Sequence, residues 1–92
     1  MIDWLNMPPL SALRAFSAFA ETGSVVAAGQ SLNVSHAAVS QQIRALEAHT
    51  GLALVDRSGR GLELTTDGHQ LATALTEGFG GIDRMLAALT GA

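Results

Sequence analysis

The chain has 92 residues, a formal net charge of −3 at pH 7 and no cysteine. This length suits one small domain with an appended helix, and the lack of cysteine excludes a disulfide framework and a thiolate metal site. The opening MIDWLNMPP is not a signal peptide and no apolar run is long enough to cross a membrane, so we expect a cytoplasmic protein.

The first predicted helix follows Pro8 and Pro9, which keep the preceding residues out of a helix. Ser11 is its expected N-cap, and Gly23 is expected to end it. It should support the helix of residues 36–48 from behind. The residues expected in the core are Leu13, Phe16, Phe19 and Ala20 of the first helix, with Trp4 and Phe79 as further large side chains.

Residues 24–47 predict two short helices joined by a tight LNVS turn. Ser24 and Ser35 are the expected N-caps, and Asn33 tolerates the left-handed backbone that such a turn uses. Gly29 lies where the two helices would approach most closely. The apolar stripes are Val25, Ala28 and Leu32 in the first helix, and Val39, Ile43 and Leu46 in the second. The pattern is typical of a helix-turn-helix that reads DNA, although a helical hairpin in a core would share it.

Gly51 is expected to end the second of these helices. LALVDR and LELT then predict two short strands around the glycine-bearing SGRG turn, which lacks the spacing of a nucleotide-binding loop. Thr65 or Thr66 should cap the last helix, with Asp67 favourable in its first turn.

The last helix repeats apolar residues at alternating steps of four and three, the pattern of a coiled-coil seam. Since a single helix has no core of its own, we expect a second copy to cover this seam, with folding back onto its own domain as the alternative. Gly78, Gly80 and Gly81 indicate either close contact across a dimer or a kink near residue 80. The seam consists of Leu71, Leu75, Phe79, Ile82, Leu86 and Leu89.

This order of segments resembles the N-terminal DNA-binding domain of LysR-type transcriptional regulators. LSALRAF resembles the first helix of the family, GSVVAAGQSLNVS its second helix and turn, SHAAVSQQIRALE its recognition helix, and GLALVDRSGRGLELTTDG its wing and the start of its linker helix. Within the family, PPLSALRAF and SGRGLELTTDG look most like the branch of glycine-cleavage activators and β-lactamase regulators. Val26 and Ala27 depart from the pattern, because Thr or Ser and a basic residue are frequent there.

The resemblance implies a mainly α fold with a small β-hairpin. A winged helix-turn-helix DNA-binding domain would occupy residues 1–66 and a dimerising linker helix residues 67–92, with the effector-binding domain absent. The recognition helix would span 35–50 and the wing 54–64. The implied partners are double-stranded DNA with two-fold symmetry and a second copy of the chain. A small-molecule effector would act only through a downstream domain not present here, whether the chain is a fragment or a complete small protein.

Base reading is expected on the side of the recognition helix opposite its apolar stripe. There Ala37 can touch a thymine methyl, Gln41 can pair with adenine, and Arg44 can reach guanine, phosphate or Glu47. His36 could contact a base edge or stay solvated. Of the wing arginines, Arg60 should enter the minor groove or follow phosphate, and Arg57 should contact phosphate or pair with Asp56. The full set of expected DNA-binding residues is Ser35, His36, Ala37, Ser40, Gln41, Arg44, Arg57 and Arg60.

The net charge argues against DNA binding, because affinity for a duplex depends on neutralising phosphates. Its distribution weakens the objection, since residues 35–61 carry three arginines against two acids and the rest carries two arginines against six acids. The competing hypothesis is an acidic helical dimer that serves as a protein–protein interaction module. An enzyme is not expected: His36, His49 and His69 lack metal-ligand spacing, so the sequence predicts no catalytic site, metal or cofactor.

Overall fold

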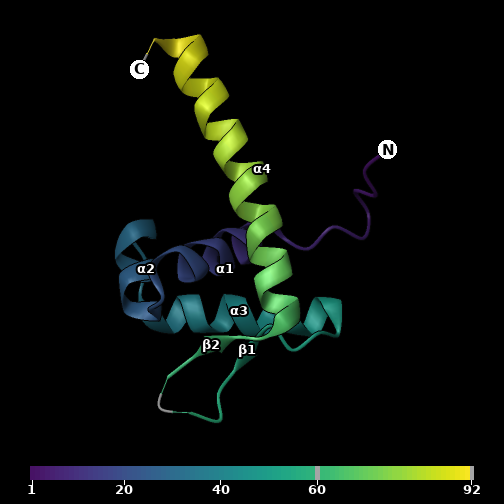
Figure 1. The fold of residues 1–92 in the computed structure, drawn as a ribbon, viewed down its shortest axis with the longest axis vertical. Coiled ribbons are helices and arrows are strands. Elements are labelled where there is room, and N and C mark those ends of the chain that lie inside the picture. The colour runs from purple at the N-terminus through teal and green to yellow at the C-terminus, as the bar shows by residue number, and fades with distance from the viewer. Residues whose placement is uncertain (60, 92) are drawn as a thin grey trace.

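The computed structural model describes residues 1–59 and 61–91. Within them the elements follow the order α1 (Leu10–Thr22), α2 (Val25–Leu32), α3 (His36–Thr50), β1 (Val55–Asp56), β2 (Glu63–Leu64) and α4 (Thr66–Thr90). Helices α1, α2 and α3 pack together, the hairpin lies beside α3, and α4 runs past α1 and projects away from the domain (Figure 1). The predicted mainly α fold with a small hairpin and a long last helix is confirmed.

Helix α1 begins at Leu10, two residues earlier than a cap at Ser11 would require. Pro9 occupies the N-cap position with an extended backbone (φ −54°, ψ 139°) and no side-chain capping bond, so the prediction of Ser11 as N-cap was wrong. Ser11 instead lies in the first turn, where its hydroxyl donates to Gln42 Oε1 of α3 at 3.4 Å. The end of the helix was predicted correctly, since Gly23 is left-handed (φ 76°) and its N–H donates to the Phe19 carbonyl at 2.7 Å.

The turn between α2 and α3 follows from its residue types. Ser24 and Ser35 accept hydrogen bonds from the amides three residues later, at 3.2 and 3.1 Å, and so cap the two helices. Asn33 takes the left-handed conformation (φ 58°) that the sequence predicted. Gly29 is buried against the turn, because a Cβ there would lie 2.7 Å from the Val34 carbonyl oxygen. The close approach expected at Gly29 is therefore confirmed.

The core lies between the first three helices and the base of the hairpin. Its fully buried large side chains are Phe16, Val39, Ile43, Leu46 and Leu54. The whole apolar stripe predicted for α3 is thus in the core, and Phe79 of α4 packs at its edge. The prediction for Trp4 was wrong. Its side chain is 70% exposed, because only Asn6 of this segment reaches the end of α3, where its carbonyl lies 3.0 Å from His49 Nε2, and the residues before it extend away from the packed helices (Figure 1).

The hairpin has a shorter ladder than the sequence predicted. β1 and β2 are antiparallel and pair Val55 with Leu64 and Asp56 with Glu63. Before the ladder, the Leu54 carbonyl accepts from the Thr65 amide at 3.1 Å, and this bond brings the start of α4 against the base of the hairpin.

Thr65 is the N-cap of α4, the first of the two predicted candidates. Its Oγ1 accepts from the Gly68 amide at 3.0 Å and donates to the Ala53 carbonyl at 2.6 Å, so one hydroxyl ties the helix to the chain ahead of β1. α4 then continues unbroken through Gly78, Gly80 and Gly81 (Figure 1). These three glycines therefore do not end the helix.

Candidate nucleic-acid interface

Helix α3 presents one polar side to solvent and buries the other. Ala37, Gln41 and Arg44 are exposed and Ser40 is half-buried, whereas the opposite stripe lies in the core. In Figure 1, α3 lies between α1 and the hairpin, so it is supported from behind by one and flanked by the other. The sequence predicted which side of this helix is buried and which is exposed, and the structure confirms that division.

The start of α3 adds two exposed polar groups, Ser35 and His36. The Ser35 oxygen is already used, because it accepts from the Ala38 amide at 3.1 Å. Its hydroxyl proton remains available to donate to a phosphate or a base edge. His36 lies in the first turn, where the partial positive charge of a helix N-terminus favours a nearby anion.

The wing differs from the sequence prediction in its ion pair. Arg57 Nη2 donates to Glu47 Oε1 at 3.1 Å, so the second of the two alternatives given for Arg57, a pair with Asp56, was wrong. The first alternative, a phosphate contact, stays a prediction. Asp56 is satisfied by Ser58, whose hydroxyl and amide donate to Oδ1 at 2.7 and 2.8 Å. These two bonds lower the pKa of Asp56, because they favour its ionised form.

The sequence offered a surface ion pair with Glu47 as an alternative role for Arg44, and this alternative was wrong. Within the described ranges, the ion pair of Glu47 is with Arg57, which approaches from the wing. Arg44 instead lines a hollow of about 290 Å³ between α3 and the wing. The walls of this hollow are Ser40, Ile43, Arg44, Arg57, Gly59, Gly61 and Leu62. Two guanidinium groups beside one hollow form a local positive site that suits phosphate. Arg60, also predicted to bind DNA, lies outside the described residues.

The predicted seam of α4 divides into two parts. The first half packs against the core of its own domain through Leu71, Leu75 and Phe79. For this half, the alternative prediction, that the helix folds back onto its own domain, is confirmed. The second half projects beyond the domain and remains exposed. The exposed residues are Ile82 at 57%, Leu86 at 55% and Leu89 at 75%, together with Met85 at 58%. Sequence reasoning missed Met85, although it follows Ile82 at helical spacing.

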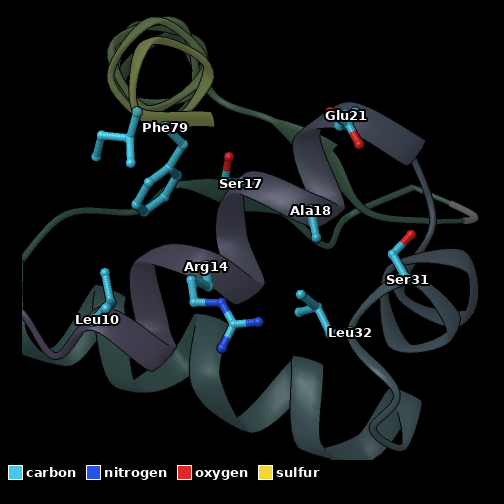
Figure 2. A pocket seen from close by; sticks show the side chains of 9 residues that line it. Leu10, Arg14, Ser17, Ala18, Glu21, Ser31, Leu32 and Phe79 are labelled. Carbon is cyan, nitrogen blue, oxygen red and sulfur yellow. The ribbon is translucent and has the colours of Figure 1, made fainter. Parts of the chain in front are cut away.

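A second hollow, of about 460 Å³, opens between α1, α2 and α4. Figure 2 shows Phe79 of α4 facing the α1 residues Leu10 and Arg14, with Leu32 of α2 at the far side. Ile82, which belongs to the exposed half of the seam, also lines this hollow. The hollow and the exposed half of the seam are therefore continuous. Leu10, 61% exposed at the start of α1, was not singled out by sequence reasoning, because it lies outside the periodic core face.

The described residues hold no group of three or more His, Cys, Asp or Glu side chains that could bind a metal ion. In the same part of the chain, none of the helices is long and apolar enough to cross a membrane.

The match to known proteins decides the family. The model of bacterial regulatory helix-turn-helix proteins of the lysR family matches residues 10–69. The chain belongs to the LysR family. The AhcY transcriptional activator HvrB of Rhodobacter capsulatus is 55% identical over 78 residues, which are 85% of this chain and 27% of HvrB. A carbapenem-hydrolyzing beta-lactamase transcriptional activator of Enterobacter cloacae is 52% identical over 69 residues, covering 75% of this chain and 23% of that protein.

The solved structures agree with this assignment. A complex of the BenM DNA-binding domain with catB site 1 DNA superposes with a TM-score of 0.78 at 28% identity, covering 89% of this chain and 92% of that one. The fold of this LysR-family chain is therefore a winged helix-turn-helix of the DNA-binding type. The chain spans only about a quarter of the length of the curated relatives.

Proposed function

We propose that this chain is the DNA-binding part of a LysR-type transcription regulator and that, as a dimer, it reads an operator with two-fold symmetry. The observation that carries this proposal is the exposed side of α3, where Ala37, Gln41 and Arg44 lie opposite a fully buried stripe. A helix supported in this way can enter the major groove with those side chains leading. The BenM domain, which has the same fold, was solved with DNA, and this supports duplex DNA as the ligand.

Direct reading of bases is assigned to the longest side chains of this surface. Gln41 can bond an adenine through two hydrogen bonds, Arg44 can do the same with guanine, and Ala37 can contact a thymine methyl. The remaining groups are suited to phosphates or nearby base edges. These are Ser35, His36 and Ser40 on α3, Arg57 at the wing, and Arg60 beyond the described part of the wing.

The charge of the chain is compatible with this role because of where it lies. Residues 35–61 carry three arginines against two acids, although the whole chain carries −3. A dimer would bring two such stretches to one duplex. Few cations also mean few phosphates neutralised, so specific base contacts must supply much of the affinity.

Dimerisation is assigned to the exposed half of α4. The first half of the seam is half-buried against its own domain and braces the helix, whereas Ile82, Met85, Leu86 and Leu89 form an apolar strip without cover in the described structure. A second copy would bury the same strip from both sides of a two-fold axis. We accordingly place the DNA-binding domain at residues 1–66 and the dimerising linker helix at residues 67–92.

The relatives are transcriptional regulators, from which we infer that this chain is not an enzyme and that it works in the cytoplasm, where the bacterial chromosome lies. A small-molecule effector would be bound by a downstream domain, in keeping with the greater length of the relatives. The competing role as a protein interaction module has no specific observation in its favour.

Selection of bound sequences from random duplexes tests the reading surface. Gln41→Ala is expected to relax the preference at one base pair of each half-site, a loss of about 1 to 3 kcal/mol of discrimination, with non-specific affinity little changed. Gln70→Ala, an equal truncation at an exposed position of α4, is the control and should keep the preference of the parent. An unchanged preference in the Gln41 variant would place base reading elsewhere.

Sedimentation tests the dimer. Leu86→Asp would place a charge in the apolar strip and is expected to yield monomers that bind the operator weakly. Thr73→Asp adds the same charge on the opposite side of α4 and should leave the dimer intact. A parent that stays monomeric at high micromolar concentration would contradict the assignment.

A further inference from the structure

Glu47 is the residue through which α3 and the wing are joined. Its carboxylate Oε2 accepts hydrogen bonds from the backbone amides of Leu54 at 2.8 Å and Val55 at 3.3 Å. Its Oε1 accepts from Arg57 Nη2 at 3.1 Å. A single side chain near the C-terminal end of the recognition helix therefore holds both the entry of β1 and the arginine that follows this strand.

The carboxylate is ionised at neutral pH. Burial alone would raise the pKa of Glu47, but the amides of Leu54 and Val55 and the guanidinium of Arg57 together lower it below its ordinary value. The side chain of Glu47 is only 15% exposed, whereas that of Arg57 is 39% exposed. The negative partner is thus enclosed, and the positive partner remains open to a ligand.

Arg57 has donors to spare in this arrangement. One N–H of Nη2 is taken by Glu47, and a guanidinium carries several others in a rigid planar fork. Arg57 also lines the hollow between α3 and the wing, together with Arg44. A phosphate at this hollow could be met from the helix side and from the wing side at once.

We propose that Glu47 is a positioning residue for DNA binding: it holds Arg57 beside the hollow in an orientation ready to donate to a backbone phosphate, and so sets how the wing sits on the duplex relative to α3. This proposal rests on the proposed DNA-binding function. Its physical basis is preorganisation. An arginine already held in place loses less side-chain entropy when it binds than one that moves freely in solvent.

If Glu47 only held the backbone in place, Oε2 would suffice, because it accepts from both backbone amides. The second oxygen is bonded to an arginine whose own side chain is open to solvent, and in the described part of the chain this is the one ion pair. If Glu47 positions Arg57, then replacing Glu47 should change the number of DNA phosphates that the protein neutralises. A purely structural role would change only the stability of the fold.

The test is the salt dependence of duplex binding for a double-mutant cycle. Arg57→Gln is expected to make the slope of log affinity against log salt shallower by about one per protomer, because it removes one phosphate contact. Glu47→Gln removes a negative charge, which by itself would favour binding, so the equally shallow slope that we expect in that variant would report that the released Arg57 no longer holds the phosphate. The affinity of Arg57→Gln should fall on the order of tenfold per protomer at low salt. The double variant should bind like Arg57→Gln alone, because Glu47 acts through that arginine. Glu63→Gln removes an equal charge from β2 and is the control, expected to bind at least as tightly as the parent with an unchanged slope.

Two results would overturn the proposal. Glu47→Gln with a lower melting temperature but the slope of the parent would make Glu47 a structural residue only. A double variant with a slope shallower than that of Arg57→Gln would show that Glu47 does not act through Arg57. If Glu47→Gln fails to fold, Glu47→Asp takes its place, because it keeps the charge and shortens the reach by one methylene.

A measurement without DNA separates this proposal from the proposed function. In nuclear magnetic resonance of the free protein, the guanidinium N–H signals of Arg57 should be resolved and slowly exchanging in the parent and averaged in Glu47→Gln. Signals that are averaged in both proteins would refute the positioning of Arg57. A parent with no salt-dependent binding to duplex DNA would overturn the function itself, and with it the phosphate role of the pair, whatever the resonance result.

Discussion

Gly68 lies where α4 meets the base of the hairpin, and a single methyl group there tests how rigid this junction is. A Cβ at Gly68 would collide with the Leu54 carbonyl oxygen and lie 3.3 Å from Thr65 Oγ1. The Leu54 backbone has little freedom to retreat. Its amide donates to Glu47, its carbonyl accepts from the Thr65 amide, and its side chain is fully buried. Gly68→Ala must therefore push α4 away from the domain or distort its first turn.

The expected cost follows from two opposing terms. Overpacking against fixed backbone costs about 3 kcal/mol, whereas alanine is favoured over glycine within a helix by about 1 kcal/mol. The net loss is about 2 kcal/mol, which lowers the melting temperature of a domain of this size by roughly 8 to 16 °C. Gly78→Ala, in the same helix, meets nothing within 4 Å. At concentrations where the chain is a monomer, it should gain about 1 kcal/mol and melt roughly 4 to 8 °C higher than the parent.

Thermal unfolding followed by far-ultraviolet circular dichroism measures both variants. All proteins must be compared at one concentration, because association makes the melting temperature depend on concentration. The reasoning is refuted if Gly68→Ala melts with the parent while Gly78→Ala is stabilised, since the junction would then yield to a methyl group at no cost.

Two further predictions concern the helix caps and acid stability. Ser35→Ala should cost about 1 kcal/mol in urea unfolding through loss of its cap, and Thr65→Ala about 2 kcal/mol because its hydroxyl also donates to Ala53; equal losses would contradict this. The lowered pKa of Glu47 stabilises the fold above the ordinary value of 4.5, and this contribution is lost as pH falls through the lower folded pKa. Glu47→Gln should therefore melt at a lower temperature than the parent at neutral pH, and the two melting temperatures should converge in acid. A difference that does not change with pH would contradict a stabilising ionised Glu47.

The features that the sequence predicted well are those decided within a few residues. The N-caps at Ser24 and Ser35 depend on a hydroxyl beside its own helix start, and the left-handed Asn33 on the tolerance of that residue type. The buried stripe of α3 depends only on helical periodicity. The exposed side of that helix, which we propose reads bases, could be located for the same reason, because it is what remains when the stripe is placed in the core.

The features that the sequence did not predict depend on how distant segments meet. Arg57 follows β1, and nothing local distinguishes its neighbour Asp56 from Glu47 as an ion partner. The choice is made when the hairpin folds back along α3 and brings the wing over the end of that helix. Trp4 shows the opposite error: a large aromatic residue predicts burial only if an element covers it, and the residues before Asn6 extend away from the domain (Figure 1).

The seam of α4 shows where periodicity stops being informative. Its spacing places Leu75 and Leu86 on related faces of one helix, and no property of the residues says which neighbour covers each. The base of the hairpin decides it, because Thr65 fixes the start of α4 against the domain, so the first turns pass α1 and the later turns run beyond it. Leu75 is consequently half-buried and Leu86 is 55% exposed. Replacement by aspartate should therefore act mainly on folding at Leu75 and mainly on association at Leu86, although the sequence pattern makes the two positions look equivalent.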